Sequence, residues 1–152
     1  PLEEKYALVR GMVIKIAKRS FISVDVFGRE NLPEKDGYIV CPNHQGKYDG
    51  HAILYSSERP ISFVVDEKRS HGLLVSDFLD LMEAERLVKT NPKKCIESFN
   101  RVKANVSERG MNYCIFPEGK HCKNKKLVCY GAGEHFLTVL RKYKKHEKQF
   151  SN

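Results

Sequence analysis

The stretch Tyr38-Ile39-Val40-Cys41-Pro42-Asn43-His44 is a short apolar run that ends in polar residues. Residues 61–65 and 112–116 are further short runs of the same apolar character. Continuous apolar runs of this length fit strands that are buried on both faces. Helical patterns fall between these runs, and strands that alternate with helices predict an α/β fold. We therefore expect a mixed, mainly parallel central sheet flanked by helices.

The clearest helical segment spans residues 92–109. Pro92 suits the first position of a helix that follows Asn91, and Gly110 is placed to end it. Glu97 and Arg101 are spaced to pair across one turn. The apolar residues form one stripe, which we interpret as core packing: Cys95, Ile96, Phe99, Val102 and Val106.

The N-terminal part contains two further predicted elements. Residues 3–19 have apolar positions at helical spacing, such as Leu8, Met12 and Ile16, and a basic opposite face. This helix either packs on the sheet or lies on an anionic lipid surface, and the pattern favours neither. Residues 23–27 alternate between polar and apolar, which predicts a half-buried strand.

Length and composition indicate a single globular domain. Within the 152 residues we expect an amphipathic helix at 1–20, the core of the domain at 21–140 and a basic tail at 141–152. No run approaches the roughly 18 apolar residues of a transmembrane helix. The five cysteines are odd in number and lack paired spacing, which fits a reducing environment.

The net charge of +8 favours anionic partners, namely nucleic acid, acidic lipid or phosphorylated substrates. No aromatic and basic platform or helix-turn-helix pattern supports nucleic acid, so we do not expect it as a partner. His121, Cys122 and Cys129 do not have the spacing of a zinc knuckle, and no metal site is expected.

The polar residues after the first strand contain a histidine and a carboxylate, His44 and Asp49. A neutral imidazole can take a proton from a substrate hydroxyl, and a carboxylate on its other nitrogen fixes the tautomer. The alternative is structural: His44 caps a helix and Asp49 occupies its favourable N-terminal end. No serine or cysteine stands at a nucleophile elbow, so the pattern indicates a direct general base.

A second polar motif, Phe116-Pro117-Glu118-Gly119, follows the last predicted strand. Lys120 and His121 come directly after it. Basic groups around a glycine turn can hold a phosphate, and Glu118 can accept hydrogen bonds from substrate hydroxyls. An ordinary turn with solvated lysines is the alternative.

Taken together, the two motifs resemble those of the glycerophospholipid acyltransferases, the 1-acylglycerol-3-phosphate acyltransferase-like family. Residues 43–49 (NHQGKYD) are similar to its Asn-His-x-x-x-x-Asp motif, and residues 114–121 (CIFPEGKH) contain its Phe-Pro-Glu-Gly motif in the same order. Residues 28–33 (GRENLP) resemble the run that precedes the first motif in many members. Tyr130 and Gly133 resemble the segment after the second, so the resemblance covers about residues 20–140.

The resemblance implies transfer of a fatty acyl chain from acyl-CoA or acyl carrier protein to the hydroxyl of a lysophospholipid. The expected acceptor is 1-acylglycerol-3-phosphate, which would give phosphatidic acid. His44 would be the base and Asp49 its orienting partner, with Glu118 and Gly119 in the phosphoglycerol site. No cofactor is implied. The family also implies an anionic membrane surface as partner, at the cytoplasmic face, with the chain peripheral or anchored by a segment absent from it.

Three departures from the family pattern bear on activity. Lys89, which we expect to contact substrate, stands where the family usually has an arginine between the two motifs, and it lacks the bidentate fork of arginine. Lys120 and His121 stand where the family often has Thr-Arg, which makes phosphate contact weaker or dependent on pH. The family's later Val-Pro strand has no counterpart after Leu140, so we expect a fragment or an altered C-terminus without the C-terminal strand. A catalytically impaired phospholipid-binding module is therefore the alternative function.

Overall fold

A four-stranded parallel sheet lies at the centre of the structure, a computed structural model that describes residues 1–44 and 46–117. The strands lie in the order β1-β4-β2-β3, and every pair is parallel. Their bounds are β1 (Ile39–Val40), β2 (Ser62–Asp66), β3 (Glu85–Leu87) and β4 (Tyr113–Ile115). The predicted α/β class with a mainly parallel sheet is confirmed. The expected lack of a further C-terminal strand and the basic tail concern residues outside the described ranges.

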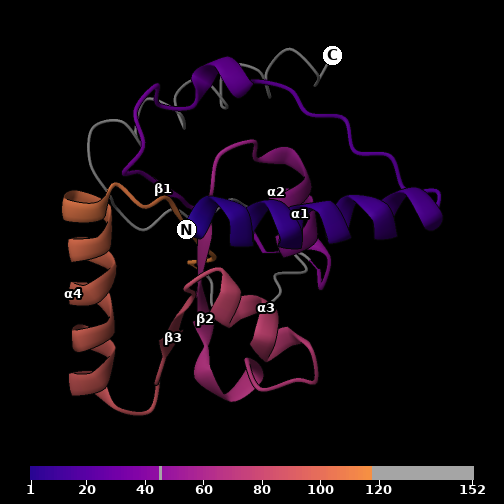
Figure 1. The fold of residues 1–152 in the computed structure, drawn as a ribbon. Helices are drawn as coiled ribbons and strands as arrows, with labels where there is room; N and C mark the ends of the chain where they lie inside the picture. The colour runs from indigo at the N-terminus through magenta and orange to yellow at the C-terminus, as the bar shows by residue number, and fades with distance from the viewer. Residues whose placement is uncertain (45, 118–152) are drawn as a thin grey trace, which may run out of the picture.

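Helices cover both faces of the sheet (Figure 1). One face carries α1 (Leu2–Arg19), α2 (Asp49–Ser56) and α3 (Val75–Leu81), and the other carries α4 (Pro92–Arg109). Two short 3-10 helices, η1 (Arg29–Asn31) and η2 (Glu67–Arg69), lie in the connections.

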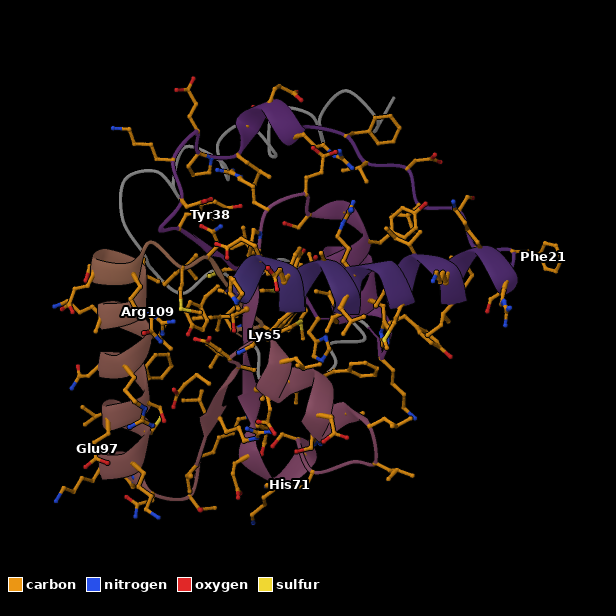
Figure 2. The ribbon with its side chains drawn as sticks, in the orientation of Figure 1. Lys5, Phe21, Tyr38, His71, Glu97 and Arg109 are labelled. Atoms are coloured by element: carbon orange, nitrogen blue, oxygen red, sulfur yellow. The ribbon has the colours of Figure 1, made fainter. Side chains whose placement is uncertain are left out.

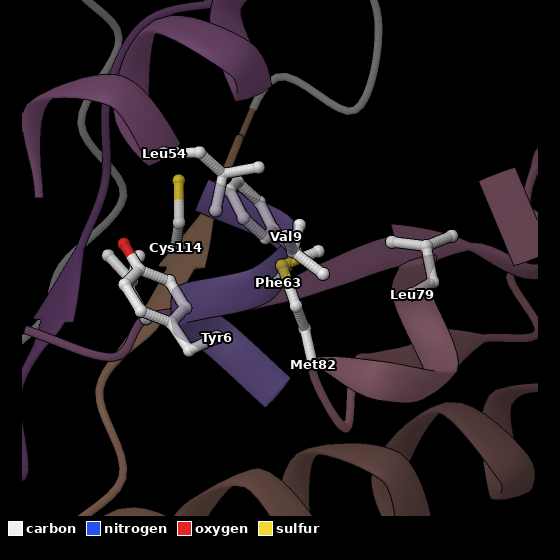
Figure 3. Close-up of a cluster of buried hydrophobic side chains, with 8 residues drawn as sticks. Tyr6, Val9, Leu54, Phe63, Leu79, Met82 and Cys114 are labelled. Atoms are coloured by element: carbon white, nitrogen blue, oxygen red, sulfur yellow. The ribbon is translucent and has the colours of Figure 1, made fainter. Parts of the chain in front are cut away.

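The sheet therefore separates two hydrophobic clusters. Phe63 and Cys114 face the larger cluster, whereas Val64 and Tyr113 face the smaller one, because successive side chains of a strand point to opposite faces. The larger cluster (Figure 3) consists of Tyr6, Val9, Leu54, Ile61, Phe63, Leu79, Met82 and Cys114. The smaller cluster consists of Val64, Val102, Met111 and Tyr113.

The N-terminal helix α1 packs on the body of the protein. Tyr6, Val9 and Ala17 are buried in this packing. The Tyr6 hydroxyl donates to the carbonyl of Ser57 at 3.2 Å, and Arg10 donates to the carbonyl of Tyr55 at 3.2 Å. Of the two alternatives for this helix, packing is observed, so its buried face is not available to a lipid surface. Among the described residues, none of the helices combines the length and apolar character needed to cross a bilayer.

Helix α4 begins and ends where the sequence predicts. The Asn91 side chain accepts from the Lys94 N–H at 3.1 Å, and Gly110 ends the helix in the left-handed conformation. The predicted apolar stripe is partly wrong, because Ile96 and Phe99 are exposed. Buried Ser98 faces the sheet one residue before Phe99, and its hydroxyl donates to the carbonyl of Arg86. Arg101 donates to Glu85, at 2.6 Å in the shortest bond, and to the Ser98 hydroxyl at 2.9 Å, where a pair with Glu97 was predicted.

The structure differs from the sequence-based expectation at two other places. The strand predicted at residues 23–27 does not form, because no described strand lies alongside to pair with this segment. Its alternation survives only as half-buried Val24 and Val26 between exposed neighbours. Strand β3 was not predicted, since two of its three residues, Glu85 and Arg86, are charged. Their charges are satisfied by Arg101 and by Asp80.

A single buried side chain, Asn112, joins the starts of three strands. Its Oδ1 accepts the N–H groups of Gly37 at 2.9 Å and Tyr38 at 3.4 Å. Its Nδ2 donates to Asp36 Oδ1 and to the carbonyl of Pro60, both at 2.9 Å. The segments before β1 and β2 are thus held against the segment before β4.

We expect Asn112→Ala to lower the free energy of unfolding by about 2 kcal/mol, because partly buried backbone groups at Gly37 and Pro60 lose their partner. Urea denaturation measures this change. The matched control is Asn100→Ala on the exposed face of α4, for which we expect a change within about 0.5 kcal/mol. A loss no larger than that of the control would contradict the role given to Asn112.

Candidate active site

The structure brings His44 and Asp49 together beyond the carboxyl end of β1. His44 Nδ1 lies 2.9 Å from Asp49 Oδ2, and the same oxygen accepts the Gly46 N–H at 2.9 Å. A carboxylate only accepts, so the ring donates from Nδ1 and a neutral ring has its basic lone pair on Nε2. Asp49 is the first residue of α2, where the helix dipole favours negative charge. The N-cap residue is Tyr48, so His44 is not the helix cap that the structural alternative required.

The beginning of the second motif lies beside the first. Strands β1 and β4 are neighbours, with Val40 opposite Cys114, so their carboxyl ends meet at one edge of the sheet. The Phe116 ring stacks on the His44 ring, with centroids 4.3 Å apart and planes inclined by 29°. Glu118, Gly119, Lys120 and His121 lie outside the described residues, so their substrate-binding roles stay predictions.

His44 lies on the wall of a cavity of about 620 Å³. This volume is within the usual range for small-molecule sites, and the lining is mostly apolar. Helix α1, helix α3 and the adjoining face of the sheet supply the apolar side chains, which include Val9, Met12, Val13, Ile16, Phe63, Val65, Val75, Phe78, Leu79 and Met82. The cavity can therefore enclose a long apolar group next to a general base.

Charged side chains line the same cavity: Lys47, Asp66, Arg69 and Lys89. Lys89 Nζ lies 3.0 Å from Asp66 Oδ2, and the Lys68 N–H donates to Asp66 Oδ1 at 3.1 Å. The hydrogen bond from Lys89 lowers the pKa of Asp66 from its ordinary value of 3.8. The lysine predicted to bind substrate is thus held at the cavity by an ionised carboxylate.

Sequence reasoning missed Asp66 and Arg69 as members of this site. Asp66 is the last residue of β2, and Arg69 belongs to the 3-10 helix that follows. Ligands of parallel sheets bind beyond the carboxyl ends of strands, so a polar residue at the end of the run 61–65 was a usable signal.

The arrangement combines three chemical functions. The His44–Asp49 pair can move a proton, the apolar wall can enclose a hydrocarbon chain, and the cations can hold a phosphate. Within the described ranges, no group of three His, Cys, Asp or Glu side chains is arranged to hold a metal ion.

We expect Lys89→Gln to lower the free energy of unfolding at neutral pH by less than about 1 kcal/mol, since the Asp66–Lys89 pair is partly exposed. Asp66 has a lowered pKa in the folded state, so its contribution is complete above the ordinary value of 3.8 and is lost as the pH falls through the lower folded value. The difference between the two proteins should therefore shrink in acid.

Urea denaturation over a series of pH values measures this difference. Lys93→Gln, at an exposed position on α4, is the control and should show a small change that does not vary over the same acid range. A difference for Lys89→Gln that stays constant into acid would contradict the role of the ion pair.

Comparison with known proteins identifies the family. The model of the Acyltransferase family matches residues 23–143 of the 152 residues, a range that contains both polar motifs. No significant match was found among curated proteins or among solved structures. The family match covers well over half of the chain and agrees with the parallel sheet and the base beside an apolar cavity. The chain therefore belongs to the Acyltransferase family, and acyl transfer is its general chemistry.

Proposed function

We propose that this protein transfers a fatty acyl chain from acyl-CoA or acyl carrier protein to the free hydroxyl of a lysophospholipid. The acceptor that we favour is 1-acylglycerol-3-phosphate, and the product is then phosphatidic acid. The observation that carries the proposal is the His44–Asp49 pair, with 2.9 Å between Nδ1 and Oδ2, on the wall of a large apolar cavity.

In this proposal His44 acts as a direct general base. Nε2 takes the proton of the acceptor hydroxyl as its oxygen attacks the thioester carbonyl carbon. The carbon–sulfur bond then breaks, and the leaving thiolate takes the proton from the imidazolium, so the products are an ester and a free thiol. Asp49 holds Nδ1–H and stabilises the imidazolium between the two proton transfers.

The cavity and its charges support this choice of substrates. The apolar wall suits an acyl chain, because each buried methylene contributes about 0.8 kcal/mol to binding. Lys47, Arg69 and Lys89 line the cavity and suit a phosphate group. Glu118, Gly119, Lys120 and His121 complete the acceptor site in this proposal, as the sequence motif implies.

The second candidate is a phospholipid-binding module with little or no turnover. Lys89 motivates it. A lysine that pairs with Asp66 binds a phosphate group more weakly than an arginine with its bidentate fork would. The two candidates share the lipid ligand and differ in thiol release.

We expect His44→Ala to reduce thiol release from an acyl-CoA by about 1000-fold, and Asp49→Asn by about 100-fold, because general-base catalysis contributes on the order of 100- to 10,000-fold. The assay is thiol release by the purified protein with 1-acylglycerol-3-phosphate as acceptor.

His71→Ala is the matched control for these variants. His71 also pairs with a carboxylate, Glu67, at 3.2 Å, but it does not line the cavity. Full activity of His44→Ala would overturn the mechanism. Binding of lysophospholipid vesicles without thiol release from any acyl donor would favour the binding module.

We expect Gly50→Leu to lower kcat/KM for long acyl donors more than for short ones, since its side chain would occupy part of the cavity that Gly50 lines. Gly50→Ala is the control: a Cβ there would lie 3.8 Å from the Phe63 ring, an ordinary contact. Thiol release with a series of acyl-CoA chain lengths measures the ratio. An equal loss for all chain lengths would argue against this cavity as the acyl site.

A further inference from the structure

Two leucine side chains near the apolar cavity are exposed to solvent. We name residues 72–74, which lie between η2 and α3, the leucine loop. Leu73 is 93% exposed and Leu74 is 61% exposed. Leu74 also has φ of +65°, a backbone conformation that costs energy for a residue with a branched side chain. The loop therefore exposes apolar surface in a strained conformation.

The leucine loop is continuous with the mouth of the cavity. Val75, which follows the loop as the first residue of α3, lines the cavity and is 47% exposed. Ile16 of α1 lines the same cavity and is 58% exposed. Because both residues contact the cavity and solvent, the cavity reaches the surface between the C-terminal half of α1 and the start of α3. At the end of α1, Phe21 projects away from the body of the protein (Figure 2).

Basic side chains flank these apolar residues. Exposed cations precede the leucine loop and occupy the last turns of α1: Lys68, Arg69, Lys15, Lys18 and Arg19. Of the nearby carboxylates, Glu67 pairs with His71 and Asp80 with Arg86, and Asp77 lies in the first turn of α3. The net charge around the leucine loop and the end of α1 is therefore positive. Apolar side chains that enter hydrocarbon, flanked by cations at the headgroup level, fit an anionic bilayer.

We propose that the leucine loop and the C-terminal end of α1 dock on an anionic lipid bilayer, with Leu73 and Leu74 in the hydrocarbon. An acyl chain then passes between Ile16 and Val75 into the cavity without crossing water. A lipid surface was one of two alternatives for residues 3–19, but the inner face of α1 is buried in the core, so only its exposed C-terminal end takes part in this docking. The route for the acyl chain rests on the proposed function, whereas the docking itself does not.

The absence of tryptophan from the chain allows a direct test. Leu73→Trp creates a single tryptophan in the leucine loop, and Ile96→Trp creates one at a 62% exposed position on α4. With vesicles of phosphatidylcholine and phosphatidylglycerol, emission of the Leu73→Trp protein should shift to the blue and be quenched by lipids brominated on their acyl chains. Ile96→Trp should show neither effect. Equal responses of the two proteins, or no response of either, would overturn the proposal.

A double variant, Leu73→Gln with Leu74→Asn, tests the energetic role of the leucines. Asparagine tolerates a positive φ, so thermal unfolding should show a protein at least as stable as the wild type. Its partitioning onto the same vesicles should fall about tenfold or more. The control, Ile96→Gln with Phe99→Gln, removes two exposed apolar residues from α4 and should partition as the wild type does.

Two further measurements separate the other outcomes. If the Leu73→Trp emission shifts with protein concentration in the absence of lipid, and sedimentation shows a dimer, a second copy covers the loop and the proposal is wrong. Thiol release separates docking from chemistry: the double variant should keep the wild-type rate on a monomeric short-chain acceptor and lose activity on vesicles. Vesicle binding through the leucine loop without any thiol release would refute the proposed function and leave the docking intact.

Discussion

The amide of Asn112 is the interaction on which the sheet depends. The strands are short, from two to five residues, so their ladders contain few hydrogen bonds. The four hydrogen bonds of this one side chain hold the segments before β1 and β2 against β4. In the register of β1 against β4, Ile39 lies opposite Tyr113. This register sets where the segments after β1 and β4 leave the sheet, at its carboxyl-terminal edge. The stacking of His44 on Phe116 follows from that register.

Features that depend on local chemistry could be predicted from the sequence. The bounds of α4 followed from Asn91, Pro92 and Gly110, which act within one turn of each helix end. The contact between His44 and Asp49 is also local, since a tight turn at the start of α2 brings the two residues together. The apolar runs that became β1, β2 and β4 were sufficient for the fold class.

Features that depend on distant partners could not be predicted in this way. Residues 23–27 have the alternation of a strand, yet a strand forms only where another can pair with it. Strand β3 lacks an apolar pattern and is stabilised instead by Arg101 and Asp80, which bind its charged residues from two helices. Asp66 and Lys89 meet because β2 and β3 are neighbours, which the sequence does not state. The cavity depends on how α1 and α3 pack, and no single sequence motif indicates that packing.

The strand order determines when the sheet can form during synthesis. Strand β4 is the last described strand in the chain, yet it lies between β1 and β2, which do not pair with each other. During synthesis, β1 and β2 therefore have no mutual ladder and must wait until β4 has left the ribosome. Such non-local pairing is slow, and unpaired strand edges stay open to aggregation in the meantime. Phe116 follows β4 directly, so the base and its aromatic neighbour meet only in this closing step. A nascent chain therefore has no assembled reaction centre until the sheet around it is complete.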